Sequence, residues 1–518
     1  MIKIDGILLP LDTDFNDLKN EIAKTVEPRD SIVSVRLYKK SVDARGRGEP
    51  RFCCSVLLEV KDETAFLSAN KNAKIYDKTP YIFKKAQKKT EHPPVVVGFG
   101  PAGMFAALTL ARAGLCPVVI ERGADVDTRT KDVSDFFSGG KLNENSNIQF
   151  GEGGAGTFSD GKLNTGIKDR RVRTVLETFV QFGASGDILY EAKPHIGTDV
   201  LRCVVKNIRK EIIDLGGEVR FGTRFEGVRS KNGKLCGIIA SGKEIPAENL
   251  FLCIGHSARD TFLMLKESGF DMCRKPFAVG VRIEHLQSDI NRALYGKYAE
   301  HKNLGAADYK LAVHLKSGKG VYTFCMCPGG EVVNAASEQG GIVTNGMSFN
   351  ARSGENANSA LLVGVAPEDL PGSDVLAGVE FQRGIERRAY DLGGGKVPVC
   401  TVGYFLGKSK NEIGRVKPTV KPGFALLNVG ELFPDFIISS LKSGIIEMDK
   451  KLRGFADSEA LISAPETRSS SPVRILRGDN MQSLSAKGIF PCGEGAGYAG
   501  GIVSAAVDGI KAAEEIIY

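Results

Sequence analysis

The sequence is most restrictive in what it lacks. It contains no run of about 18 apolar residues, so no membrane-spanning helix is predicted. The opening segment, MIKIDGILLPLDTDFND, has early acids and no sustained apolar core, so no secretory signal is predicted. The 11 cysteines include no Cys-x-x-Cys pair, and the six histidines show no metal-ligand spacing. These absences argue against a disulfide framework or a metal site and favour reduced thiols in the cytoplasm.

A large excess of charge is also missing. The net charge is +7 over 518 residues, and 25% of the residues are charged and 42% hydrophobic, as in ordinary globular proteins. A nucleic-acid partner is therefore allowed but not favoured. The length suits two or three domains. Nothing in the composition sets an oligomeric state.

The most informative segment that is present is VVVGFGPAGMFAALTLARAG, from Val95 to Gly114. Three valines predict a buried strand, and Gly98, Gly100 and Gly103 follow in Gly-x-Gly-x-x-Gly order before an Ala- and Leu-rich helix. This order is typical of a turn that brings a helix N-terminus to a pyrophosphate. The next strand, CPVVIERG, ends at Glu121, near the spacing expected of a ribose-binding acid.

A second glycine-rich element lies near the end of the chain. Ile489 and Phe490 predict a strand that leads into Gly493, Glu494 and a loop of small residues. A helix is expected from about Val503, so this loop also presents helix N–H groups to an electron-rich ligand.

A third glycine-rich segment, NENSNIQFGEGGAGTFSDGKLNTGIKD, runs from Asn143 to Asp169. It is too polar for a core. One interpretation is a flexible surface loop. The other is a backbone cradle around a cofactor, with Ser159 and Lys162 supplying polar contacts.

With these three elements the chain resembles the FAD-dependent oxidoreductases that have a glutathione-reductase-type flavin domain. CIGHSARD at Cys253, CMCPGG at Cys325 and ETRSSSPVRI at Glu466 further resemble an uncharacterised bacterial subgroup, the FAD-dependent or NAD(FAD)-utilising dehydrogenases. The resemblance implies one non-covalent FAD, with the backbone of Phe225 near the adenine and Glu494 near the ribitol. The implied cofactor-binding residues are Gly98, Gly100, Pro101, Ala102, Gly103, Glu121, Arg122, Gly153, Gly154, Gly156, Ser159, Lys162, Phe225, Gly255, Gly493, Glu494, Gly500, Gly501 and Ile502.

Few residues are candidates for catalysis. His256 follows a glycine turn and is either a general base near neutral pH or a structural histidine. Strand alternation predicts that the Cys325 and Cys327 thiols share one face, as a redox pair or as packing residues. Arg468 and Arg474 flank three serines and suit a carboxylate or phosphate of a substrate, although a plain surface loop explains them equally well.

The predicted fold class is α/β, with a Rossmann-like FAD-binding domain, an inserted substrate domain of mixed β-sheet and helices, and a small N-terminal α+β domain. Residues 1–92 alternate as strand, helix, two strands and helix, which suggests a ferredoxin-like unit with a turn at 44–50. Residues 93–265 and 476–518 form the FAD-binding domain, with a hairpin turn at Asn232-Gly233. Residues 266–475 form the insertion.

The predicted function is an FAD-dependent oxidoreductase, a dehydrogenase or reductase that moves two electrons through the flavin to or from an unidentified small molecule. The alternative is a flavoprotein that binds or modifies RNA, which the basic balance and the N-terminal unit suggest. The sequence has no second Gly-x-Gly-x-x-Gly. NAD(P)H is therefore expected at most as a transient electron donor.

Overall fold

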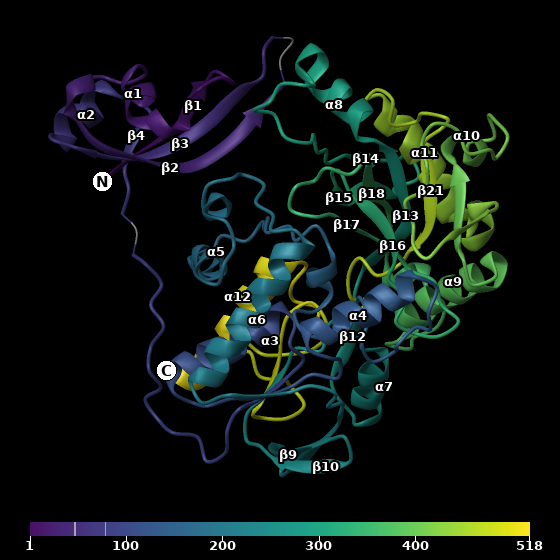
Figure 1. Ribbon diagram of the computed structural model, residues 1–518. Helices are drawn as coiled ribbons and strands as arrows, with labels where there is room; N and C mark the ends of the chain where they lie inside the picture. Colours follow the sequence, from purple (N-terminus) through teal and green to yellow (C-terminus); the bar gives the residue numbers. More distant parts are fainter. Residues whose placement is uncertain (46–47, 78) are drawn as a thin grey trace.

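The computed structural model describes residues 1–45, 48–77 and 79–518 of a mixed α/β protein (Figure 1). The N-terminal sheet lies at one side of the main body (Figure 1) and contacts it through Lys40, whose backbone pairs with Tyr190 and Ala192, and through Leu304. Residues 79–94 form an irregular segment that leads into the parallel sheet. The main body consists chiefly of a parallel sheet and a larger mixed sheet. In the described part of the chain, no helix combines the length and the apolar content that crossing a membrane requires.

The N-terminal unit is an antiparallel sheet in the order β2-β3-β1-β4. The chain runs strand, helix, strand, strand, helix, strand, which is the split βαβ order. Asp62 caps the second helix by accepting hydrogen bonds from the amides of Thr64 and Ala65. The predicted turn at 44–50 contains residues 46 and 47, which lie outside the described residues. The elements are β1 (Ile2–Leu9), α1 (Leu18–Ala23), β2 (Ile32–Asp43), β3 (Arg51–Val60), α2 (Glu63–Ala69) and β4 (Ala73–Ile75).

The second unit is a five-stranded parallel sheet in the order β23-β11-β5-β6-β7. Residues alternate between the two faces of the sheet along strand β5, so its three valines show what covers each face. Val96 packs with helices α3, α5, α6 and α12, whereas Val95 and Val97 pack with the three-stranded sheet β8–β10 and with α7. The elements are β5 (Val95–Val97), α3 (Pro101–Ala113), β6 (Val118–Ile120), α4 (Val126–Phe137), α5 (Arg171–Gln181), α6 (Thr198–Asp214), β7 (Glu218–Arg220), β8 (Phe225–Lys231), β9 (Lys234–Ala240), β10 (Lys243–Pro246), β11 (Leu250–Leu252), α7 (Arg259–Glu267), β23 (Ile489–Pro491) and α12 (Ile502–Ile517).

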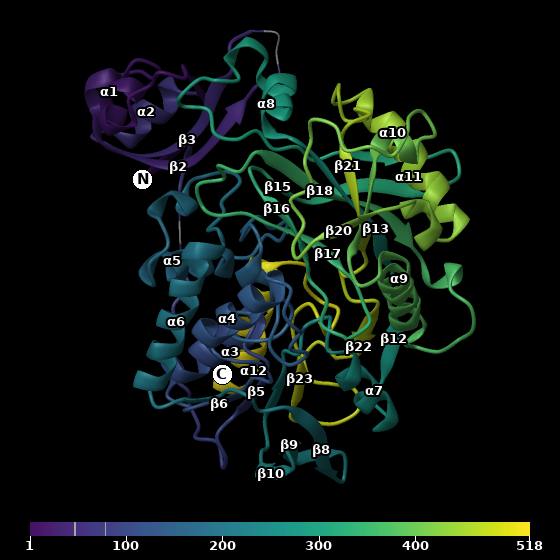
Figure 2. The same cartoon turned by 45° about the vertical axis from the view of Figure 1, so that its right-hand side comes forward.

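The third unit is a seven-stranded mixed sheet in the order β14-β15-β18-β13-β21-β19-β20. Helix α11 packs closely on it, because a Cβ added at Gly444 would lie 2.6 Å from Val321. The elements are β12 (Met272–Arg274), β13 (Phe277–Leu286), α8 (Gln287–Tyr295), β14 (Ala312–His314), β15 (Gly320–Cys327), β16 (Glu331–Asn334), β17 (Thr344–Met347), β18 (Asn356–Val365), α9 (Ala377–Gly393), β19 (Val397–Thr401), α10 (Val402–Phe405), β20 (Phe424–Leu426), α11 (Asp435–Asp449), β21 (Leu461–Glu466) and β22 (Val473–Ile475). Figure 2 shows this sheet and its helices beside the parallel sheet.

The hairpin turn predicted at Asn232-Gly233 is confirmed, since both residues have positive φ, 52° and 71°. The regular strand alternation predicted for Cys325 and Cys327 is interrupted by a bulge, although the two residues remain in contact. The pairing of β15 with β18 shifts register between Phe324 and Cys327, and Cys325 has a φ of 43°. Such a bulge re-aims the side chains within it.

Candidate functional site

A cavity of about 460 Å³ lies where the parallel sheet meets the seven-stranded sheet. This volume is within the range of cofactor sites. All three glycine-rich segments reach its wall, although they are far apart in the sequence. The predicted residues on the wall are Gly98, Gly100, Pro101, Ala102, Glu121, Arg122, Gly154, Gly156, Ser159, Lys162, Phe225, Gly255, His256, Cys325, Arg468, Glu494, Gly500, Gly501 and Ile502.

Five predicted site residues do not line this cavity: Gly103, Gly153, Cys327, Arg474 and Gly493. The glycines among them serve packing. A Cβ at Gly103 would lie 1.9 Å from the Gly98 carbonyl oxygen, and one at Gly493 would lie 2.7 Å from the Ala102 side chain. Gly493 also donates its amide to Asp508 at 2.8 Å.

Two helices begin at the cavity wall. Helix α3 begins at Pro101 after Gly100, and α12 begins at Ile502 after Gly501. No side chain caps either start, so both present free N–H groups and the positive end of a helix dipole. A dinucleotide such as FAD fits this arrangement, because its diphosphate and its electron-rich ring edge each need such donors.

Positive-φ glycines bring the segments together backbone to backbone. Gly98 has a φ of 91°, and a Cβ there would lie 2.4 Å from the Cys253 carbonyl oxygen at the end of β11. Gly154 has a φ of 65°, and a Cβ there would lie 2.9 Å from the Gly100 Cα. Any side chain would force these strand ends and loops apart.

Glu121 joins the same segments through its carboxylate, which is 6% exposed. It accepts hydrogen bonds from the amides of Phe99 at 2.8 Å, Gly123 at 2.9 Å and Gly151 at 3.1 Å. A carboxylate has about four acceptor positions, so one remains for a ligand hydroxyl. The residue therefore holds the turn as well as facing the cavity.

Glu494 and His256 face each other across the cavity wall, with His256 Nε2 4.0 Å from Glu494 Oε1. Burial raises the pKa of Glu494 to about 7, although Lys275 opposes the shift. Burial, together with Arg468 and Arg259, lowers the pKa of His256 to about 4. His256 is therefore neutral at physiological pH. Because the ring is buried beside two cations, this environment favours the structural alternative over a base tuned to neutral pH.

The structure does not bring Arg468 and Arg474 together at the cavity. The Arg468 guanidinium donates to the Glu386 carboxylate at 3.1 and 2.8 Å. Arg474 donates to the Gly497 carbonyl oxygen at 3.3 Å and lies over the Tyr498 ring. Both cations serve internal contacts, so the predicted two-arginine anion site is not formed.

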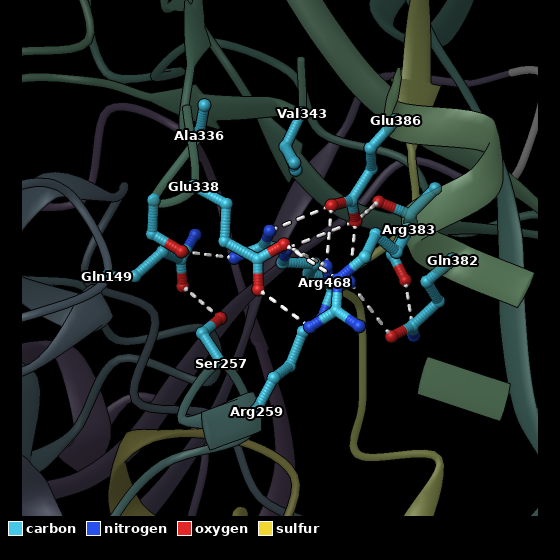
Figure 3. A network of polar contacts seen from close by, with 12 residues as sticks. Gln149, Ser257, Arg259, Ala336, Glu338, Val343, Gln382, Arg383, Glu386 and Arg468 are labelled. Atoms are coloured by element: carbon cyan, nitrogen blue, oxygen red, sulfur yellow. Dashed lines mark hydrogen bonds and ion pairs between the residues drawn. The ribbon is translucent and has the colours of Figure 1, made fainter. Parts of the chain in front are cut away.

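Arg468 belongs to a buried ionic network that links the two sheets (Figure 3). Arg259, at the start of α7, donates to both Glu386 oxygens at 2.8 Å. Glu386 lies on α9 of the insertion, and Arg259 also contacts Glu338 at 3.1 Å. Beside the network, Ser257 donates to Gln149 at 3.1 Å (Figure 3), which connects the turn at His256 to the third glycine-rich segment, residues 143–169.

Lys162 extends from the third glycine-rich segment to strand β15 of the seven-stranded sheet. Its ammonium donates to Asp160 at 2.6 Å and to the Met326 carbonyl oxygen. Burial would lower the pKa of Lys162, but Cys327, Asp160 and Cys325 raise it, so the side chain stays charged. Ser159 instead bonds within its own turn, to the Gly156 carbonyl oxygen at 2.7 Å.

Several residues of the wall were not predicted from the sequence. Some lie at strand ends of the parallel sheet and others on the insertion. No spacing rule assigns these residues to a site, even where they lie in a segment that carries the family resemblance, as Cys253 and Glu466 do. They include Gln149, Cys253, Tyr309, Lys310, Asn345, Glu466 and Cys492.

Comparison with known proteins gives a family for the chain. A family model described as "FAD-dependent protein, C-terminal domain-like" matches residues 276–469, and a domain of unknown function matches residues 1–59. An uncharacterized protein of Clostridium beijerinckii is 49% identical over 529 residues, covering 100% of this chain and 98% of the relative. The chain belongs to the family of this clostridial protein.

Solved structures are less similar. The glycerol-3-phosphate dehydrogenase from Bacillus halodurans, complexed with FAD, is 11% identical with a TM-score of 0.35, over 83% of this chain and 65% of that one. A geranylgeranyl bacteriochlorophyll reductase-like protein from Thermoplasma acidophilum is 11% identical with a TM-score of 0.34, over 82% and 77%. CtdE in complex with FAD is 10% identical with a TM-score of 0.29, over 82% and 83%.

Proposed function

We propose that this protein is an FAD-dependent oxidoreductase that transfers two electrons to or from a small molecule. The observation that carries the proposal is the single cavity into which three distant glycine segments and two helix N-termini converge. The match of residues 276–469 to an FAD-dependent family supports it. The bound flavin would supply the redox chemistry, and the protein would bind and orient it.

The cavity residues divide into two ends under this proposal. Glu121 and Phe225 would hold the adenosine end. One acceptor position of the Glu121 carboxylate remains free, and Phe225 lines the same cavity. The N-terminus of α3 would hold the diphosphate. Glu494 and the N-terminus of α12 would hold the ribitol and ring, in a glutathione-reductase-type domain made of residues 93–265 and 476–518.

The protonation states of Glu494, His256 and Lys162 decide which hydrogen bonds the protein would offer to the flavin ring. Glu494, with a pKa of about 7, is partly protonated at neutral pH and can donate a hydrogen bond. His256 is neutral and can accept or donate one. Lys162 stays charged at the wall. The insertion, residues 266–475, would cover the ring and exclude water from it.

The cofactor itself is the first test. We expect the purified protein to be yellow, and its heat-denatured supernatant to contain FAD by chromatography. Gly500→Val should abolish retention, because Gly500 lines the cavity and a Cβ there meets no protein atom within 4 Å, so the variant can fold. Gly305→Val, at a glycine with equally open surroundings away from the cavity, should retain FAD. Colourless protein that also takes up no added FAD would refute the proposal.

The electron donor is the second test. With no second dinucleotide motif in the sequence, NADH or NADPH should bleach the flavin slowly under anaerobic conditions. Fast, saturable bleaching at micromolar nucleotide would contradict this expectation. No comparison favours the RNA alternative, so we do not carry it further.

A further inference from the structure

Two cysteines of unequal exposure stand side by side at the end of β15. Cys325 lines the cavity, whereas Cys327 is 0% exposed and lies behind the wall. Cys325 lies in the bulge between Phe324 and Cys327 and has a positive φ. The Cys325 side chain therefore departs from the alternation of the strand. The Cys327 thiol donates a hydrogen bond to the Cys325 carbonyl oxygen at 3.3 Å. Strained non-glycine positions of this kind gather at functional sites.

Fixed positive charge surrounds the pair. The Lys162 ammonium bonds the carbonyl oxygen of Met326, the residue between the two cysteines. The Arg282 guanidinium, 0% exposed, donates to the Cys325 carbonyl oxygen at 3.2 Å. Asp160 pairs with Lys162 and with Arg352. Glu466 and Asn358 accept hydrogen bonds from Arg282. Glu494 faces the pair across the cavity.

These surroundings make the two thiols chemically unequal. The hydrogen bond from Cys327, with Lys162 and Arg282, lowers the pKa of Cys325 to about 6 against the opposing effect of burial. The bond to Cys325 and burial raise the pKa of Cys327 well above 9. An accessible thiolate beside a buried thiol is the arrangement of an attacking and a resolving cysteine.

We propose that Cys325 and Cys327 form a redox-active dithiol that exchanges electrons with the flavin and with a small thiol or disulfide entering the cavity. The inference rests on the proposed function and names its substrate class. The Cys325 thiolate attacks one sulfur of the substrate disulfide, which breaks the substrate S–S bond and releases the first product as a thiolate that takes up the proton of Cys327. Cys327 then gives up its proton and attacks Cys325, which releases the second thiol and forms the Cys325–Cys327 disulfide.

The cycle closes on the reduced flavin. With FAD bound, the Cys325–Cys327 disulfide would accept two electrons and two protons from the reduced flavin, which would break the S–S bond, regenerate the dithiol and leave oxidised FAD. The net reaction converts one disulfide and one reduced flavin to two thiols and one oxidised flavin. The reverse direction oxidises thiols.

The dithiol can be tested without any bound flavin. Protein treated with oxidised glutathione, alkylated and digested should give one peptide that carries a Cys325–Cys327 disulfide, two hydrogen atoms lighter than the reduced peptide. Alkylation of Cys325 in reduced protein should follow a pH midpoint near 6, and Cys327→Ala should raise this midpoint. Cys400→Ala, which removes another 0% exposed thiol of the same sheet, should leave the midpoint unchanged. Absence of the disulfide together with an ordinary midpoint near 9 would overturn the proposal.

Electron exchange needs the flavin-bound protein. Under anaerobic conditions dithiothreitol should bleach the yellow absorption, and Cys325→Ala or Cys327→Ala should slow the bleaching at least tenfold while retaining FAD. Cys400→Ala should bleach at the parent rate. Equal rates in all variants would overturn the relay even if the disulfide forms. Colourless protein that still forms the disulfide would instead count against the proposed function alone.

Discussion

Glu386 is the residue whose replacement most directly tests the ionic link between the two sheets. Its carboxylate is 1% exposed and accepts four hydrogen bonds from Arg259 and Arg468 at 2.8 to 3.1 Å, and one from Thr467 at 2.6 Å. Glu386→Gln keeps the shape but removes the charge, so the buried Arg468 loses its hydrogen-bonded counterion and the buried Arg259 keeps only Glu338. Breaking a buried ion pair from one side costs about 3–5 kcal/mol. We expect a loss of that size in the free energy of unfolding.

The measurement is urea unfolding followed by far-UV circular dichroism. Glu447→Gln is the matched control, because Glu447 forms an exposed i,i+3 pair with Lys450. An exposed pair of this kind contributes little, so the control should differ from the parent by less than about 0.5 kcal/mol. A loss below about 1 kcal/mol for Glu386→Gln would refute the view that the network holds the insertion against the flavin side.

The pH dependence of the same variant gives a second check. Burial would raise the pKa of Glu386, but Arg468 and Arg259 hold it well below the ordinary 4.5. The carboxylate therefore contributes stability that is fully present above pH 4.5 and is lost as the pH falls through the lower pKa of the folded state. The difference in stability between parent and variant should be constant from pH 5 to 7 and shrink in more acidic solution.

Three further predictions concern the cavity. Gly98→Ala should destabilise the fold by about 1–3 kcal/mol through its positive φ alone, and more through the contact with Cys253, as measured by urea unfolding; an unchanged free energy would contradict the turn geometry. Glu121→Gln should weaken FAD binding by about 1.5–3 kcal/mol in a fluorescence titration, whereas the exposed Glu218→Gln should not; equal dissociation constants would remove Glu121 from the site. The pKa of Glu494 is raised from 4.5 to about 7, so the folded state binds a proton that the unfolded state has lost, and the stability of the parent protein should fall as the pH rises from 5 to 7. Glu494→Gln should abolish this pH dependence of the melting temperature. A pH dependence that persists in the variant would belong to another group.

The parts of the site that the sequence predicts are those set by backbone geometry. Gly98 and Gly154 are glycines because a positive φ and a close backbone neighbour leave no room for a Cβ. Such constraints act within a few residues and leave a readable motif. The hairpin at Asn232-Gly233 is predictable for the same reason, because both of its turn residues have positive φ.

Ion pairs between residues far apart in the sequence cannot be predicted from a local motif. Arg468 suits an anion ligand when only its neighbours are read, but its counterion Glu386 lies 82 residues away on α9. The pKa of His256 depends on Arg468 and Arg259, which no spacing rule connects to it. Charges that meet only after folding decide these properties.

Gly493 and Gly500, both in the glycine-rich element near the end of the chain, show that one motif can contain a packing residue and a cavity residue. Gly493 packs against Ala102 and donates its amide to Asp508, so it supports the helix pair from behind. Gly500, seven residues later, faces the cavity with no atom within 4 Å of a Cβ. The sequence assigns both to the cofactor, yet only the second has space in front of it. Replacing Gly493 should therefore disturb the packing of α3 on α12 before it affects any ligand, whereas replacing Gly500 should affect the ligand alone.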